Sequence, residues 1–220
     1  AHDNAKLKLD EKFRLLELGN RKTKGAQKEI FDALGLPYGH RIESFDHSHI
    51  QGADPVSALV VFTDGEPDKH EYRKYKLKGE VEHQNAADEV GNTREVVRRR
   101  YSRLLKEHKK MPDLILMDGG QIQVDACLDV LRNELNVNIP VAGMVKDDHH
   151  RTNHLIFGDP TQGEELKLIP LNPKSEGFYL MTRIQDEVHR FAITFHRRTH
   201  AKNALSSKLD EIKGIGPKSR

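Results

Sequence analysis

Three short apolar runs limit what this chain can fold into. They are PVSALVVF at 55–62, DLILMD at 113–118 and IPVAGMV at 139–145. Apolar runs of this length are typical of strands that are buried in a sheet. Helical spacing of apolar residues at 121–135 separates the second run from the third. This alternation predicts an α/β sheet with helices packed on it.

The segments around the first run favour antiparallel pairing. RIESFDHS at 41–48 alternates polar and apolar side chains, and Asp64-Gly65 is a turn signal. HEYRKYKLK at 70–78 alternates aromatic and basic residues, which predicts a third strand. The fold class is therefore predicted as α/β, a mixed sheet in which an antiparallel three-strand meander precedes parallel strands, flanked by helices. Further patterns predict helices at 88–108 and 175–200, and a hairpin of 154–157 with 165–170.

Composition excludes several classes of protein. The longest apolar run, Ala58–Phe62, is far shorter than the ~20 residues that span a bilayer, and we expect no signal peptide. Cys127 is the single cysteine, which excludes an internal disulfide framework and a cysteine-based zinc site. These features predict a cytoplasmic protein that has no membrane partner.

The net charge is only +2, but basic residues cluster in two segments. Residues 94–110 carry eight Lys or Arg against two Glu, a net of +6, and residues 183–220 carry nine against four acids, a net of +5. A basic run is most often a solvated helix face, although two such runs around a low-charge middle favour a polyanionic partner. Arginines of the predicted C-terminal helix could hold a phosphate backbone. They are Arg183, Arg190, Arg197 and Arg198, of which we expect Arg190 and Arg197 to contact DNA.

Two carboxylates lie where predicted strands end. Asp46 belongs to the first strand, where Asp is rare, and Asp118 ends a buried strand before Gly119-Gly120. Asp46 could simply turn to solvent, and Asp118 could cap the next helix. If the two strands are neighbours, however, both carboxylates converge at the sheet edge where α/β proteins bind ligands. Paired carboxylates of this kind suit a hard divalent cation such as Mg²⁺ or Mn²⁺.

A third group lies on the predicted C-terminal helix. At ~100° per residue, Gln185, His189 and His196 lie along one flank of its apolar stripe, at the border of the core. A histidine in such a position is most often a surface residue or a hydrogen-bonded core residue, and this chain has 13 histidines. The flank also allows a polar side chain to face a cleft.

The chain divides into three predicted segments. Residues 1–40 form a helical lead-in or linker, residues 41–203 form the α/β domain, and residues 204–220 form a linker and an incomplete DNA-binding motif. In that last segment, Gly214-Ile215-Gly216-Pro217-Lys218 is typical of the start of a helix-hairpin-helix motif. Its glycines let backbone N–H groups approach a phosphate, so we predict that Gly214, Gly216 and Lys218 contact DNA.

Six blocks of the sequence resemble the C-terminal half of the UvrC family, the endonuclease subunit of bacterial nucleotide excision repair. The blocks are FDHSHIQG (45–52), VVFTDGEPDKHEYRKYKLKG (60–79), REVVRRRYSRL (94–104), PDLILMDGGQIQ (112–123), KDDHHRTNHLI (146–156) and RIQDEVHRFAITFHR (183–197). The resemblance implies a ribonuclease H-like endonuclease domain that makes the incision on the 5′ side of a lesion, followed by helix-hairpin-helix motifs. It also implies damaged double-stranded DNA as substrate, UvrB as a partner mainly through regions outside this chain, and UvrA upstream.

The resemblance assigns roles to individual residues. It implies a catalytic set of Asp46, Asp118 and His189, in which the two aspartates hold Mg²⁺ or Mn²⁺. A further acidic position of the family falls on Asp88 or Glu89. The fifth block is expected to contact phosphate or substrate through Lys146, His150, Arg151 and Thr152.

Two other functions stay open at this point. One is a catalytically silent DNA- or protein-binding module of the same fold, which would have lost Asp46 or Asp118, and this chain keeps both. The other is an RNA-cleaving or junction-resolving enzyme of the same superfold. Such enzymes usually have an all-carboxylate site, whereas this chain offers His189 as the last member. Fold alone does not separate these functions.

Overall fold

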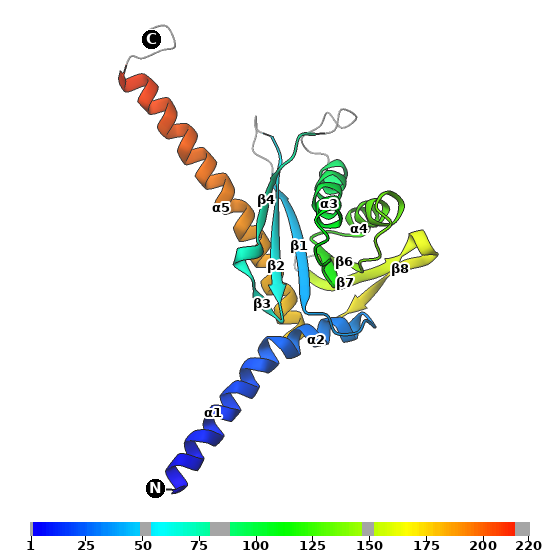
Figure 1. The fold of residues 1–220 in the computed structure, drawn as a ribbon, viewed down its shortest axis with the longest axis vertical. Coiled ribbons are helices and arrows are strands. Elements are labelled where there is room, and N and C mark those ends of the chain that lie inside the picture. The colour runs from blue at the N-terminus through cyan, green and yellow to red at the C-terminus, as the bar shows by residue number, and fades with distance from the viewer. Residues whose placement is uncertain (1, 49–53, 80–88, 147–151, 214–220) are drawn as a thin grey trace.

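The structure is a computed structural model that describes residues 2–48, 54–79, 89–146 and 152–213 (Figure 1). Within these ranges a mixed sheet contains β1 (Arg41–Ser48), β2 (Val56–Thr63), β3 (Glu66–Pro67), β4 (Arg73–Lys76), β5 (Leu114–Met117), β6 (Val141–Lys146), β7 (Thr152–Asp159) and β8 (Glu164–Pro170). The helices are α1 (His2–Lys22), α2 (Lys24–Ala33), α3 (Glu89–Lys106), α4 (Gln121–Asp129) and α5 (Glu176–Lys213). A π-helical turn, Val130–Glu134, continues α4, and short 3-10 turns lie at Lys69–Glu71 and Pro160–Gln162.

The mixed topology depends on β1. In the order β3-β2-β1-β5-β6-β7-β8, β1 is antiparallel to β2 on one side and parallel to β5 on the other. β5 and β6 are also parallel, whereas β7 and β8 continue the sheet in antiparallel pairing. The predicted order of antiparallel strands followed by parallel strands is therefore confirmed. The predicted C-terminal hairpin is confirmed as β7 and β8.

The third strand of the predicted meander is shorter than its sequence pattern suggests. The pattern at 70–78 predicts one strand, but the chain forms a 3-10 turn and then only the four residues of β4. β4 pairs with the first half of β2, and the two-residue β3 pairs with its end. Pro67 has no N–H to continue a ladder, and the Glu71 N–H donates to the Asp68 carbonyl (3.0 Å). This turn interrupts the strand.

Alternate side chains of the sheet supply two separate cores. On one face Phe45, Leu59 and Ile115 pack with residues of α3 and α4 such as Tyr101 and Cys127. On the other face the sheet packs against α2 and α5, with α5 lying across β1 and β2 (Figure 1). Buried residues of this second core include Ile42, Val60, Phe31, Ile184 and Val188.

The first and last helices extend away from this body (Figure 1). α2 buries Ala26, Ile30 and Phe31 in the second core, whereas none of the residues of α1 is buried. α5 continues to Lys213, so residues 204–213 of the predicted linker are helical, because no Gly or Pro interrupts residues 178–213. The division of the chain at residues 40 and 203 stays a prediction. No helix in the described ranges is long and apolar enough to cross a membrane.

One buried carboxylate joins β1 to α3. Glu43 is fully buried and accepts hydrogen bonds from the Tyr101 hydroxyl (2.8 Å), Arg100 Nη2 (3.1 Å) and Arg41 Nε (2.9 Å). Burial and the adjacent Glu43 carboxylate raise the pKa of Tyr101 well above its usual value, so the phenol stays protonated and donates. This cluster holds α3 against the strand that carries Asp46.

We expect Glu43→Ala to lower the free energy of unfolding by about 3–5 kcal/mol, because the buried Arg100 guanidinium loses its partner. Chemical denaturation measures the change. The matched control is Asp32→Ala, which breaks an exposed ion pair with Lys28 and should cost ~1 kcal/mol or less. Equal effects of the two substitutions would contradict the structural role of the Glu43 cluster.

Candidate active site

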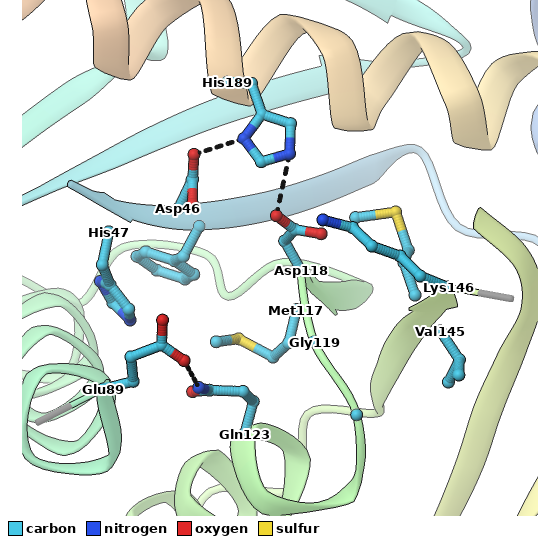
Figure 2. A pocket seen from close by; sticks show the side chains of 13 residues that line it. Asp46, His47, Glu89, Met117, Asp118, Gly119, Gln123, Val145, Lys146 and His189 are labelled. Carbon is cyan, nitrogen blue, oxygen red and sulfur yellow. Dashed lines mark hydrogen bonds and ion pairs between the residues drawn. The ribbon is translucent and has the colours of Figure 1, made fainter. Parts of the chain in front are cut away.

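Asp46, Asp118 and His189 come from three parts of the chain that meet at one end of the sheet (Figure 2). Phe45 of β1 pairs with Met117 of β5 in parallel register, so the residues that follow, Asp46 and Asp118, lie side by side. α5 packs across β1 and adds His189 to the same place. The structure thus brings together the two carboxylates and the histidine that sequence analysis singles out.

The three side chains are in direct contact. His189 Nδ1 lies 2.7 Å from Asp46 Oδ2, and His189 Nε2 lies 3.0 Å from Asp118 Oδ2. Gln185, one helical turn before His189, donates from Nε2 to Asp118 Oδ1 at 2.9 Å. Gln185 and His189 therefore face the same site, as their shared helix flank predicts. One donor atom from each member of the triad lies within 4.8 Å of the others.

Each charge in this cluster depends on the others. Burial opposes ionisation of Asp118, but hydrogen bonds from His189 and Gln185, together with the charges of His189 and Lys146, keep its pKa below the usual range. Hydrogen bonds to Asp118 and Asp46 raise the pKa of His189 to about 10, although its partial burial acts in the opposite direction. At neutral pH and without a metal, His189 is therefore an imidazolium between two carboxylates.

The donor set fits a divalent cation. Two carboxylates that lie within 4.8 Å of each other leave negative charge that a cation must balance, and oxygen donors are what Mg²⁺ and Mn²⁺ prefer. In the metal-free state the His189 imidazolium supplies that balance. Asp46 and Asp118 are the residues that would hold the metal, with His189 as a neighbour or a third ligand.

A cavity of about 400 Å³ opens in front of these residues. Glu89 at the start of α3 and Lys146 at the end of β6 also line the cavity, and both are exposed. Glu89 accepts a hydrogen bond from Gln123 Nε2 at 2.8 Å (Figure 2). Of the two predicted additional acids, Glu89 thus lies at the site, while Asp88 lies outside the described residues.

The predicted DNA-contacting residues have different surroundings. Lys146 lines the cavity beside Asp118 (Figure 2). Arg190 follows His189 on α5, and its guanidinium donates to the Glu187 carboxylate at 2.6 and 3.0 Å. The predicted contacts whose position or side chain lies outside the described residues are His150, Arg151, Thr152, Arg197, Gly214, Gly216 and Lys218.

Most of the basic residues at 94–110 form ion pairs within the fold. Its guanidinium groups pair with nearby carboxylates: Arg94 with Asp129, Arg98 with Glu134, Arg99 with Glu95, Arg100 with Glu43, and Arg103 with Glu107. The charge of this run therefore has internal counterions, and the run by itself is weak support for a polyanionic partner. The positive charge at the cavity comes instead from Lys146 and from the His189 imidazolium.

Gln123 at the cavity wall and Thr93 behind it belong to no pattern that predicts a site from the sequence. Gln123 lines the cavity, and the Thr93 hydroxyl donates to its amide oxygen at 2.6 Å. Thr93 precedes Val96 and Val97 on the core-facing side of α3, where apolar residues are expected. A polar residue within that apolar stripe is the signal that could have identified it.

Comparison with known proteins decides the family. Residues 31–193 match the family model described as the UvrC RNAse H endonuclease domain. The chain belongs to the UvrC family. UvrABC system protein C of Lactobacillus johnsonii is 98% identical over 220 residues, which are 100% of this chain and 37% of that protein. The same protein of Limosilactobacillus reuteri is 68% identical over 100% of this chain and 35% of its own length.

The chain thus spans little more than a third of its curated UvrC relatives. The UvrC match confirms the resemblance and the predicted ribonuclease H-like fold class, and it identifies the matched region as a nuclease domain. Among solved structures, human ENDOV is similar with a TM-score of 0.40 and 14% identity, covering 76% of this chain and 86% of that chain. An Endonuclease V from Bacillus subtilis has a TM-score of 0.36 and 12% identity, covering 73% and 82%.

In the metal-free protein we expect the His189 imidazole to titrate near pH 10 instead of near 6.5. Because the folded-state pKa is raised, the stabilisation from this ion pair is complete below pH 6.5 and is lost as the pH rises toward 10. NMR titration of the ring resonances measures the pKa. Asp118→Asn should lower it, because the hydrogen-bonded neighbour loses its charge. A pKa near 6.5 in the unsubstituted protein would contradict the observed contacts.

Proposed function

We propose that this chain is a divalent-metal-dependent DNA endonuclease domain that makes the 5′ incision beside a lesion in nucleotide excision repair. The observation that carries the proposal is the convergence of Asp46, Asp118 and His189 at a cavity in a UvrC-family chain. A catalytically silent binding module of the same fold has no need to keep two carboxylates and an imidazole in contact. The triad therefore favours an enzyme over a silent module.

The proposed reaction is hydrolysis of a DNA phosphodiester. Asp46 and Asp118 would hold Mg²⁺ or Mn²⁺, which when bound would supply a water of lowered pKa and charge stabilisation for the leaving oxygen. His189 holds a proton at Nε2 beside the reacting phosphate, and Gln185 orients Asp118 through its amide. Lys146 contacts a non-bridging phosphate oxygen from its place beside Asp118. Glu89 is the additional acid of the site.

The proposed substrate is damaged double-stranded DNA that is bound through its backbone. Phosphate contacts position a strand without reading its sequence, which suits an enzyme that must act at many lesions. Lys146 and Arg190 contact the DNA near the cavity, and Gly214, Gly216 and Lys218 contact it from the start of a helix-hairpin-helix motif. The proposed partners are UvrB, mainly through regions outside this chain, and UvrA upstream, and the proposed location is the cytoplasm.

We expect His189→Ala to slow 5′ incision by ~10²–10⁴-fold, the range for a positioned acid–base group. The measurement is nicking of a lesion-containing duplex by the full-length protein with UvrA, UvrB and Mg²⁺. His40→Ala is the matched control, because His40 Nδ1 also lies 2.7 Å from a carboxylate, that of Asp64, at the opposite end of β1. If His189→Ala cuts at the same rate as His40→Ala, His189 is not catalytic.

Lys146→Ala should weaken DNA binding and lower the slope of log K against log[salt] by about 1, because one phosphate contact is lost. Arg190→Ala should lower the slope by less, because Glu187 already neutralises Arg190. Fluorescence anisotropy over a range of salt concentrations measures both, with Lys28→Ala on α2 as the control. An unchanged slope for Lys146→Ala would remove this residue from the DNA interface.

A further inference from the structure

A chain of hydrogen bonds, buried in its middle, runs from β1 through α3 and α4 to the carboxylate of Glu89. His47 Nε2 lies 2.9 Å from Thr93 Oγ1, and the Thr93 hydroxyl donates to Gln123 Oε1 at 2.6 Å. Gln123 Nε2 then donates to Glu89 Oε2 at 2.8 Å, the last bond of the chain (Figure 2). This hydrogen-bond chain connects β1, the strand that carries Asp46, to the cavity wall that contains Glu89.

The middle of this chain lies where apolar residues would ordinarily pack. Thr93 is 0% exposed and Gln123 is 9% exposed, among the buried valines of α3 and α4. A buried polar group costs free energy unless it is hydrogen-bonded, so a packed Val or Leu would be the simpler solution for holding two helices together. Thr93 and Gln123 keep their hydrogen bonds as members of a hydrogen-bond chain that ends at the exposed Glu89 carboxylate. That arrangement indicates a role at the cavity.

The hydrogen bonds have a fixed direction. A hydroxyl has one hydrogen, and Thr93 gives it to Gln123, so Thr93 must accept from His47 Nε2. The Gln123 amide oxygen is then held toward Thr93, and its NH₂ group is held toward Glu89. Without the Thr93 hydroxyl the amide is free to turn over, which would place its oxygen against the Glu89 carboxylate.

The same hydrogen-bond chain is packed against Gly119, the residue that follows Asp118. Gly119 follows Asp118 directly, and a Cβ at Gly119 would lie only 2.5 Å from Gln123 Cγ. The glycine therefore leaves room for the Gln123 side chain beside the residue that carries the second catalytic carboxylate. A shift of Gln123 would change the position of Glu89 relative to Asp118.

We propose that Thr93 and Gln123 are positioning residues that hold the Glu89 carboxylate toward the cavity formed with Asp46, Asp118 and His189. The inference rests on the proposed function, in which Glu89 is the additional acid of a metal-dependent nuclease. Thr93 fixes the amide of Gln123, and Gln123 fixes Glu89. Neither positioning residue touches the DNA or the reacting atoms.

The test is a double-mutant cycle in the full-length protein with UvrA and UvrB. Thr93→Val keeps the shape of the side chain but removes the hydroxyl, and it should slow 5′ incision by ~10–100-fold, as loss of a supporting hydrogen bond does at metal sites. Thr93→Ser should restore a rate close to that of the unsubstituted protein. Thr63→Val is the matched control, because it removes a hydroxyl that bonds to Asp68 away from the cavity. DNA affinity should stay unchanged in all three variants.

If Thr93 acts through Glu89, Thr93→Val should have no further effect on the incision rate in a Glu89→Gln background. Mn²⁺ binding, measured by calorimetry without DNA, should follow the same pattern, with Thr93→Val weakening it about tenfold and adding nothing to Glu89→Gln. If Thr93→Val fails to fold, Gln123→Met replaces it in both measurements with the same expectation. The proposal would be overturned if the losses of incision rate from Thr93→Val and Glu89→Gln add in the double variant. It would also be overturned if Thr93→Ser loses as much activity as Thr93→Val.

One further variant separates this inference from the function on which it rests. Asp118→Asn should abolish 5′ incision if the domain is the proposed nuclease. If Asp118→Asn is inactive while Thr93→Val and Glu89→Gln cut normally, the positioning role and the role of Glu89 as the additional acid are overturned, and the nuclease function stands. If Asp118→Asn itself cuts normally, the proposed function fails and the positioning role fails with it.

Discussion

The parallel pairing of β1 with β5 is the constraint on which the site depends. The register that joins Phe45 to Met117 places Asp46 and Asp118 side by side, although 72 positions separate them in the sequence. β1 also pairs antiparallel with β2, so it lies inside the sheet and cannot slip without moving every side chain to the wrong face. The Glu43 cluster adds a connection from the same strand to α3. The carboxylates are thus held by two neighbouring strands in the interior of the sheet.

Two partly buried carboxylates at this spacing require a cation. In the metal-free protein His189 meets the requirement as an imidazolium that contacts both Asp46 and Asp118. A divalent metal meets it in the proposed active state, so the proton on His189 and the metal act on the same pair of charges. The raised pKa of His189 and the proposed metal binding therefore have the same cause, which is the close approach of the Asp46 and Asp118 carboxylates. Glu89 and Lys146 also line the cavity, and in the proposed active state they are the groups that face the rest of the substrate.

Local patterns were sufficient to predict the sheet and its two carboxylates, but not the contacts between distant residues. Strands 55–62 and 113–118 have unambiguous apolar runs, and Asp118 follows directly from the second. Helix spacing placed His189 on the correct flank but did not distinguish it from His196, and only the family resemblance selected it. The ion pairs of α3 could not be predicted, because Arg94 and Asp129 are far apart in sequence and their meeting depends on how α3 packs on α4. The same is true of the bond between Thr93 and Gln123, and of the turn at Lys69–Glu71 that shortens the third strand.

A single measurement can decide whether Asp46 and Asp118 form a metal site. Crystals soaked in Mn²⁺ and measured near the manganese absorption edge would locate the ion by anomalous scattering. We expect an anomalous peak in the cavity, within coordination distance of carboxylate oxygens of both aspartates, and no such peak in crystals of Asp118→Asn. A manganese peak elsewhere with none between these carboxylates, at concentrations that support incision, would contradict the metal site at the two aspartates.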